Sequence, residues 1–188
     1  MRLLWMTAAA IWFLVSPVAA QQDVRVLATN KTSTMQKEMN DAADAGYRFA
    51  AVMGGDTAVG GSEVVVLMTR VAEGKPSFAY RLLATNKTST MQKEMQAAGD
   101  AGFEYKGQTV FKSTFGGKEV VVVLEHDKTV EVPARYEYRL VATTKTSTLE
   151  KEVSEVTAAG YQFVGMTVAD TAIGGSELVS ILRKRITP

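Results

Sequence analysis

The chain contains one segment three times, and this repetition constrains its fold more than any other feature. Residues 25–71, 81–127 and 139–185 align from end to end without a gap. The letters LATNKTSTMQKEM occur twice, and a third version reads VATTKTSTLEKEV. A unit of roughly 45 residues buries too little apolar surface to be stably folded alone. We therefore expect the three units to pack against one another.

The repeat also sets the boundaries along the chain. Pro76 and Pro133 lie between the copies, where proline ends a regular element. The predicted segments are a signal peptide over 1–20, repeat 1 over 21–71, a linker over 72–80, repeat 2 over 81–127, a linker over 128–138 and repeat 3 over 139–188.

The first twenty residues have the pattern of a secretory signal peptide. Arg2 precedes a short apolar stretch, and the small residues Val18 and Ala20 suit cleavage before Gln21. We expect export to the bacterial periplasm or the extracellular space, with an uncleaved anchor as the alternative. No later apolar stretch has transmembrane length, so no membrane insertion is expected once the signal is removed.

Composition excludes several classes of function. The chain has no cysteine, so disulfides, thiolate nucleophiles and thiolate metal sites are excluded. Loss of Arg2 with the signal takes the 21 basic residues to 20, equal to the 20 acidic residues. A neutral protein has no overall positive field for nucleic acid, and we expect none to bind.

Each unit reads as strand, helix, strand and strand. In the first unit, a strand over residues 26–29 precedes a helix in which Met35 and Met39 share one face. Gly46 suits the left-handed end of that helix. The last strand contains residues 64–68, which are continuously apolar, and this predicts burial on both faces.

These elements predict an α+β fold of three tandem β-α-β-β repeats. Placing the third strand of a unit in the middle makes every neighbouring pair antiparallel. Each unit is then a three-stranded, mainly antiparallel sheet with one helix on one face. We expect the units to pack together through their sheets with pseudo-threefold symmetry, and three independently folded units are the alternative.

Each unit resembles the small strand-helix-strand-strand domains grouped as domain of unknown function 4177. The resemblance rests on an aromatic-basic entry such as Tyr138-Arg139, a capped helix, an Ala-Gly-aromatic exit such as residues 159–161, and a closing strand with a basic end such as residues 182–185. It covers almost all of the chain after the signal. It implies this fold and supplies no activity, cofactor or catalytic residue.

A Lys-Thr-Ser-Thr tetrad precedes the apolar helical pattern in every unit. Ser33, Ser89 and Ser147 are suited to be N-caps, and a Gln or Glu three residues later would complete a capping box. Capping leaves the lysine and the threonines unexplained. A helix N-terminus also favours anions, so a small anionic ligand or a protein partner could bind there, at three separate sites or one composite rim. The candidate ligand-binding residues are Lys31, Thr32, Ser33, Thr34, Lys87, Thr88, Ser89, Thr90, Lys145, Thr146, Ser147 and Thr148.

A glutamate follows the double glycine of each unit, at Glu63, Glu119 and Glu177. Antiparallel pairing would bring Glu63 towards Lys31 as an exposed ion pair. A carboxylate-dependent hydrolase using these glutamates is the alternative function, but a general base needs a second polar group and a cleft. We predict a non-enzymatic binding or scaffold protein without a metal or cofactor, whose partner is a protein or a small anionic molecule. The sequence leaves the oligomeric state open.

Overall fold

The computed structural model describes residues 23–57, 61–71, 77–112, 117–170 and 175–186, so the predicted signal peptide lies outside the described residues. The first unit contains β1 (Val24–Thr29), α1 (Thr32–Asp44), β2 (Tyr47–Thr57) and β3 (Gly61–Arg70). The second contains β4 (Phe78–Thr85), α2 (Thr88–Asp100), β5 (Glu104–Lys112) and β6 (Lys118–Asp127). The third contains β7 (Arg135–Thr143), α3 (Thr146–Ala158), β8 (Gln162–Asp170) and β9 (Ser176–Ile186).

Each unit forms its own sheet with its third strand in the middle. The strand orders are β1-β3-β2, β4-β6-β5 and β7-β9-β8, and every pair is antiparallel. Thr29 lies opposite Val64 in the first sheet, and the second sheet repeats this register with Thr85 opposite Val120. The predicted α+β fold of three β-α-β-β repeats is confirmed.

The helices bury the apolar face that the sequence predicts. Met35, Met39, Met91 and Met95 are fully buried. Each helix ends before a glycine with a positive φ, which side chains other than glycine rarely adopt. These glycines are Gly46 at 92°, Gly102 at 80° and Gly160 at 88°.

The aromatic residue that follows this glycine packs against the arginine of the first strand. The Arg25 guanidinium lies 4.6 Å from the centroid of the Tyr47 ring. The same contact joins Arg81 to Phe103 in the second unit, also at 4.6 Å. The stack explains why an arginine and an aromatic residue recur together, because a guanidinium over an aromatic face is electrostatically favourable.

The helices begin earlier than the serine caps predict. Lys31, Lys87 and Lys145 occupy the N-cap positions, and no side chain caps any of the three helices. The predicted serine caps are therefore wrong, and the three serines lie in the first turn. The reason lies in the strand before the helix: the Lys31 N–H donates to Thr29 Oγ1 at 3.2 Å, and the other two units repeat this bond. The bond turns the chain directly into the helix.

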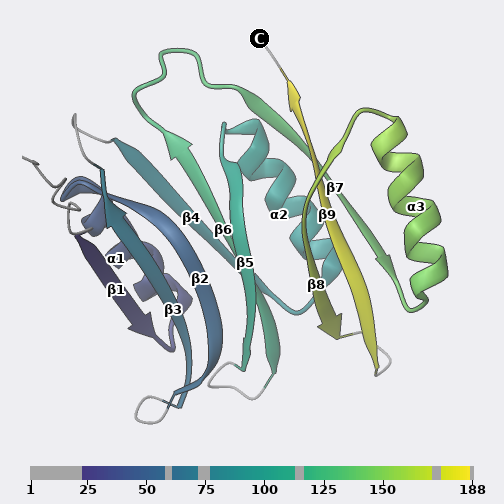
Figure 1. Ribbon diagram of the computed structural model, residues 1–188, viewed down its shortest axis with the longest axis horizontal. Coiled ribbons are helices and arrows are strands. Elements are labelled where there is room, and N and C mark those ends of the chain that lie inside the picture. Colours follow the sequence, from purple (N-terminus) through teal and green to yellow (C-terminus); the bar gives the residue numbers. More distant parts are fainter. Residues whose placement is uncertain (1–22, 58–60, 72–76, 113–116, 171–174, 187–188) are drawn as a thin grey trace, which may run out of the picture.

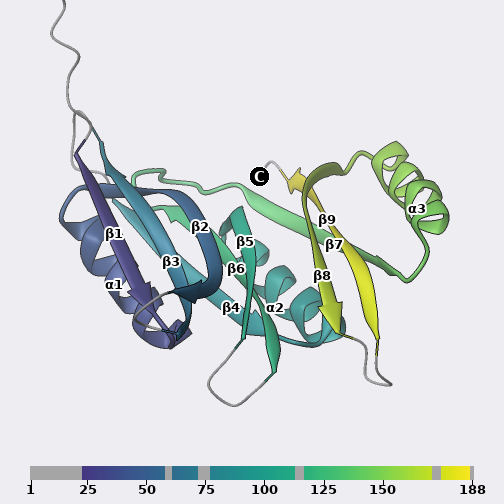
Figure 2. The same ribbon diagram turned by 60° about the horizontal axis from the view of Figure 1, so that its bottom comes forward.

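The three units follow one another in an open row, with unit 2 between units 1 and 3 (Figure 1). α1 lies between its own sheet and the sheet of unit 2. We call this contact between the two units junction 1–2. α2 lies in the same way at junction 2–3, whereas α3 stands at the end of the row with a sheet on one side only (Figure 2). Each of α1 and α2 therefore packs against the sheet of the next unit, and the units continue in a line without closing around a threefold axis.

The hydrophobic core lies at the junctions. One cluster joins Met35 and Met39 of unit 1 to Tyr80 and Val123 of unit 2. A second cluster joins the helix of unit 2 to the sheet of unit 3 in the same way. None of the residues of α3 is buried, because no fourth unit covers it. Each unit thus depends on its neighbour for a core, as its small size predicts.

Burial of the middle strands follows the position of each unit in the row. Residues 120–124 of β6, the continuously apolar strand of unit 2, are all buried. The predicted burial of residues 64–68 of β3 on both faces is wrong: Val64, Val66 and Met68 are buried, whereas Val65 and Leu67 are half-buried. The first sheet has a helix on one face and no unit on the other, so its middle strand is buried on one side only.

β4 and β7 begin inside the segments that the sequence assigns to linkers. β4 starts at Phe78 and β7 at Arg135. Phe78, Tyr80 and Tyr138 are buried, each in the cluster that joins its unit to the preceding one. The strands extend backwards because these aromatic side chains gain a buried position at the junction.

Candidate functional site

The three tetrads lie along one long edge of the row, which we call the tetrad edge. In each unit the chain passes from the first strand into the helix at this edge, and the second strand returns to it before the hairpin (Figure 1). In unit 2 a Cβ added to Gly117 at the hairpin would lie 3.9 Å from the Asn86 side chain. Tetrad, hairpin and glutamate therefore share one end of a unit, as the chain path predicts.

The tetrads form three exposed helix N-termini. The first turn of each helix contains no acidic residue and no side-chain cap. Lys31, Lys87 and Lys145 are exposed, and none of them forms an ion pair with another described residue. The structure therefore brings an ammonium group and uncapped backbone N–H groups together in every unit.

A carboxylate of the protein itself lies at one of these N-termini. The Thr88 hydroxyl at the start of α2 donates to the carboxylate of Glu177 in β9. This contact joins unit 2 to unit 3, and it differs from the pairing within one unit that the sequence predicts. No described unit follows α3, so the equivalent place beside Thr146 receives no such carboxylate from within the row.

The glutamines of the predicted capping boxes bind the next unit instead. Gln36 Oε1 accepts the Leu82 N–H at 2.9 Å, and Gln92 Oε1 accepts the Leu140 N–H at 2.8 Å. Leu82 and Leu140 belong to β4 and β7, the outer strands of their sheets. The capping box is therefore wrong, because these side chains satisfy backbone groups on a strand edge across the junction. In α3 the same position is Glu150.

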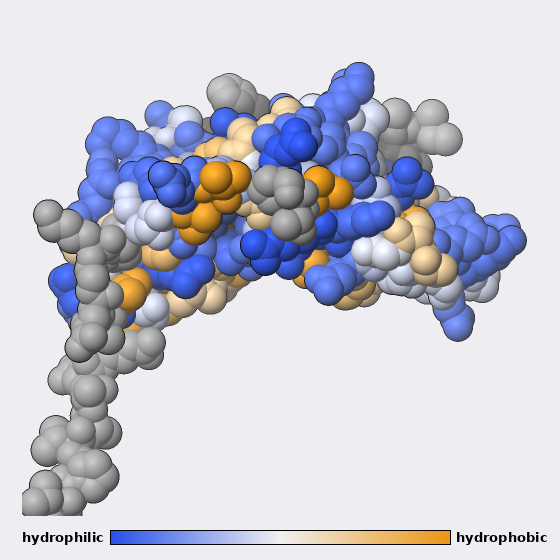
Figure 3. All heavy atoms as spheres, turned by 90° about the horizontal axis from the view of Figure 1, so that it is seen from above, coloured by the Kyte–Doolittle hydropathy of each residue, from blue (hydrophilic) through white to orange (hydrophobic). Residues whose placement is uncertain are grey.

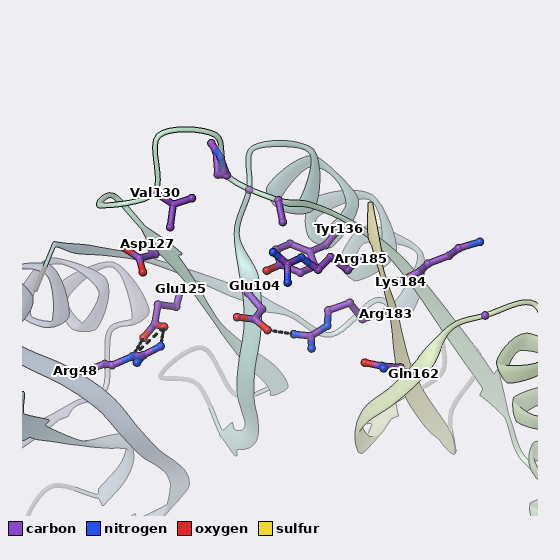
Figure 4. A pocket seen from close by; sticks show the side chains of 14 residues that line it. Arg48, Glu104, Glu125, Asp127, Val130, Tyr136, Gln162, Arg183, Lys184 and Arg185 are labelled. Carbon is purple, nitrogen blue, oxygen red and sulfur yellow. Dashed lines mark hydrogen bonds and ion pairs between the residues drawn. The ribbon is translucent and has the colours of Figure 1, made fainter. Parts of the chain in front are cut away.

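A chain of alternating charges joins all three units away from the tetrad edge. Arg48 of unit 1 contacts Glu125 of unit 2 at 2.8 Å, and Arg183 of unit 3 contacts Glu104 of unit 2 at 2.5 Å (Figure 4). Lys106 lies between the two pairs, 2.8 Å from Glu104 and 3.4 Å from Glu125. The Glu125 side chain is only 3% exposed, so its charge requires these partners.

A β-bulge places Lys106 in this network. The register of β5 against β6 shifts between Tyr105 and Gly107, which leaves Lys106 as the extra residue. The other two units have the same bulge, but Ala50 and Val164 occupy it. A bulge redirects a side chain, and here it turns the lysine towards both glutamates.

The two junctions use opposite charges at equivalent positions. Arg48 aligns with Glu104, and Glu125 aligns with Arg183. At junction 1–2 the positive side chain belongs to the preceding unit and the negative one to the following unit. At junction 2–3 the order of the charges is reversed. The role of these residues was not predicted from the sequence, although it contains a signal for them: two aligned positions whose charges reverse together.

Two buried tyrosines bind the backbone of the preceding unit, and one of them, Tyr80, also binds the network. Tyr80 donates to Glu125 Oε2 at 2.8 Å and accepts the Phe49 N–H at 2.8 Å. Tyr138 accepts the Tyr105 N–H at 2.6 Å and donates to the Phe103 carbonyl at 3.0 Å. Burial raises the pKa of both hydroxyls, so each remains a protonated donor.

A pocket of about 640 Å³ opens beside the charged network between units 2 and 3 (Figure 4). The face of the molecule at the top of Figure 1 is mostly hydrophilic, with hydrophobic patches near its centre (Figure 3). The charged side chains that line the pocket are Arg48, Glu104, Glu125, Asp127, Arg183, Lys184 and Arg185. Both glutamates are held in ion pairs, and Asp127 Oδ1 accepts hydrogen bonds from Thr129, so the pocket is lined by polar groups that already have partners in the protein.

Acid is expected to weaken junction 2–3. Burial acts to raise the pKa of Glu104, but Lys106 and Arg183 outweigh it and lower the pKa. A lowered folded-state pKa adds stability above the ordinary glutamate pKa of about 4.3, and this stability is lost as the pH falls through the folded-state pKa. Glu104→Gln should therefore flatten the loss of stability below about pH 5, as measured by urea unfolding at several pH values. Glu94→Gln, on the exposed side of α2, is the control, and identical pH profiles for all three proteins would contradict the assignment.

Within the described ranges, no group of three or more His, Asp or Glu residues is placed to hold a metal ion. In the same part of the chain, every helix is too short or too polar to cross a bilayer. No family model, curated protein or solved structure matches the chain. The resemblance to domain of unknown function 4177 stays a prediction.

Proposed function

We propose that the protein is an exported, non-enzymatic scaffold or binding protein. The observation that carries this proposal is the use of its buried and partly buried charges: Glu104, Glu125 and Arg183 form ion pairs between units. These charged side chains, which could otherwise serve as a catalytic acid or base, instead join neighbouring units to each other. A row of packed repeats presents an extended surface, which is how repeat proteins bind their partners.

The tetrad edge is the surface that best suits an acidic ligand or an acidic protein partner. It presents three uncapped helix N-termini, each with an exposed lysine. The contact between Thr88 and Glu177 supports this assignment, because a carboxylate already occupies one of these places. Of the three N-termini, that of α3 has no following unit beside it within the described residues.

Phosphate is expected to raise the melting temperature of the protein through the tetrad edge. The triple substitution Lys31→Ala, Lys87→Ala and Lys145→Ala should abolish this rise and leave the melting temperature without phosphate nearly unchanged, because all three side chains are exposed. Lys145→Ala alone should remove the largest share. Thermal unfolding followed by circular dichroism at increasing phosphate concentration measures the effect.

A matched control comes from the same three helices. Lys37, Lys93 and Lys151 are exposed lysines that lie later in each helix. Their triple replacement by alanine should keep the phosphate effect. If phosphate and sulfate do not stabilise the unmodified protein, the anion-binding form of the proposal is overturned and the scaffold form is retained.

A hydrolase that uses Glu63, Glu119 and Glu177 is the competing function. These residues lie near the beginnings of β3, β6 and β9, and those three strand ends are separated along the tetrad edge (Figure 1). Their separation argues against a shared active site. Turnover of chromogenic ester, phosphoester or glycoside substrates that is lost on replacing all three with glutamine would overturn the non-enzymatic proposal.

A further inference from the structure

The outer face of the first sheet is apolar, and in the described part of the chain it is exposed. Val24, Val26 and Met53 are 49%, 60% and 59% exposed. Val26 lies opposite Leu67, and Met53 lies opposite Val65, so all five side chains share one face. We call these five residues the front face. In units 2 and 3 the equivalent faces are buried against the helix of the preceding unit.

The other end of the row exposes the complementary half of a junction. Phe163, Met166 and Val168 of β8 are 51%, 52% and 47% exposed. Together with Leu149 and Val153 of α3 they form the rear face. Their equivalents in unit 1 include Met35, Met39, Phe49 and Val52, which all pack into the core of junction 1–2.

We infer that the rear face of one copy of the protein binds the front face of a second copy, head to tail. The inference rests on the proposed scaffold function and names its partner as another copy of the chain. The two junctions inside the chain supply the template, since each is a rear face of one unit packed on the front face of the next. A junction between unit 3 and unit 1 of the next copy continues the same repeat.

The charged positions of the junctions are compatible with this contact. At the internal junctions they hold ion pairs, whereas the two ends of the row carry Gln162 on the rear side and Thr69 on the front side. Both residues are neutral and polar. Their contact therefore buries no unpaired charge, which would otherwise oppose association.

The hydrogen bonds available at the ends are fewer than those inside the chain. By the repeat, the Glu150 carboxylate is placed to accept the Val26 N–H, as Gln36 accepts the Leu82 N–H. A carboxylate cannot donate to a carbonyl as Gln92 Nε2 does. Val24 also lacks the hydroxyl that Tyr80 and Tyr138 supply. Association should therefore be weaker than an internal junction and should depend on protein concentration.

The contact joins two different faces, so it is heterologous. Such contacts leave one free face at each end of a dimer and continue to larger assemblies, either as rings or as open arrays. A contact between two identical faces would stop at a dimer. The two modes therefore differ in the sizes of the assemblies that form.

Sedimentation velocity of the mature protein from about 1 μM to about 500 μM tests the inference. The unmodified protein should form dimers and larger species as its concentration rises. Met53→Lys on the front face and Met166→Lys on the rear face should each weaken association about 100-fold. Both side chains are largely exposed, so neither change should unfold the monomer. Val130→Lys, at a 47% exposed valine outside both faces, should associate like the unmodified protein.

An equimolar mixture of the two variants gives the most specific result. The mixture keeps one intact rear face on the Met53→Lys copy and one intact front face on the Met166→Lys copy. It should form a dimer with the affinity of the unmodified protein and nothing larger. The inference is overturned if the unmodified protein stays monomeric at every concentration, or if the mixture forms no dimer. Neither result bears on the non-enzymatic proposal, which the turnover of chromogenic substrates tests separately.

Discussion

Arg48→Glu is expected to lower the free energy of unfolding by about 3 kcal/mol, because it places a carboxylate beside the buried Glu125. The value lies at the lower end for a buried ion pair, since the Arg48 side chain is 45% exposed and part of the repulsion is screened by water. Urea unfolding followed by circular dichroism measures the loss. Gln162→Glu, the equivalent change at the exposed end of unit 3, should have little effect.

The double variant Arg48→Glu with Glu125→Arg should recover more than half of that loss. It recreates at junction 1–2 the polarity that Glu104 and Arg183 have at junction 2–3. Recovery should be incomplete, because Lys106 would then lie near an arginine in place of a glutamate. A double variant no more stable than the worse single variant in this mutant cycle would show that the charges do not interact across the junction.

Gly54→Ala is expected to destabilise the protein by about 1–3 kcal/mol, through overpacking at junction 1–2. A Cβ at this position would lie 2.6 Å from the Val110 carbonyl oxygen and 2.9 Å from the Phe111 Cβ. The carbonyl belongs to the backbone of β5 and cannot turn aside, so the strands must separate. Thermal and urea unfolding would measure the change.

The neighbouring glycine provides a matched control. A Cβ at Gly55 would have no other atom within 4 Å, and its φ is not positive. Gly55→Ala should therefore be neutral or stabilise by up to about 1 kcal/mol, through a smaller entropy of the unfolded chain. Equal effects at the two glycines would mean that the close approach of β2 and β5 does not limit this position.

The elements of each unit could be predicted because their signals are local. The spacing of Met35 and Met39 identified the buried helix face, and Gly46 marked the end of the helix. The start of the helix was predicted wrongly, because the tetrad contains three residues that are able to cap. None of the three is the N-cap: the helix begins directly after Lys31, whose N–H donates to Thr29, and Gln36 binds the next unit.

The charged network could not be predicted from one unit, because it exists only between units. Arg48 and Glu125 are 77 positions apart, and their partnership follows from how α1 lies between two sheets. Lys106 enters the network through a bulge, for which the sequence gives no clear local signal. Comparing the copies for residues that differ, as well as for residues that agree, would have identified these positions.

The reversed charges also restrict how the gene can change in length. Recombination between similar repeats tends to duplicate or remove whole units. A tandem duplicate of unit 2 would bring Glu104 of the first copy to Glu125 of the second, and loss of unit 2 would bring Arg48 to Arg183. Both of these altered chains would place two like charges next to each other at a largely buried position. Selection for a folded product would therefore oppose duplication or loss of unit 2.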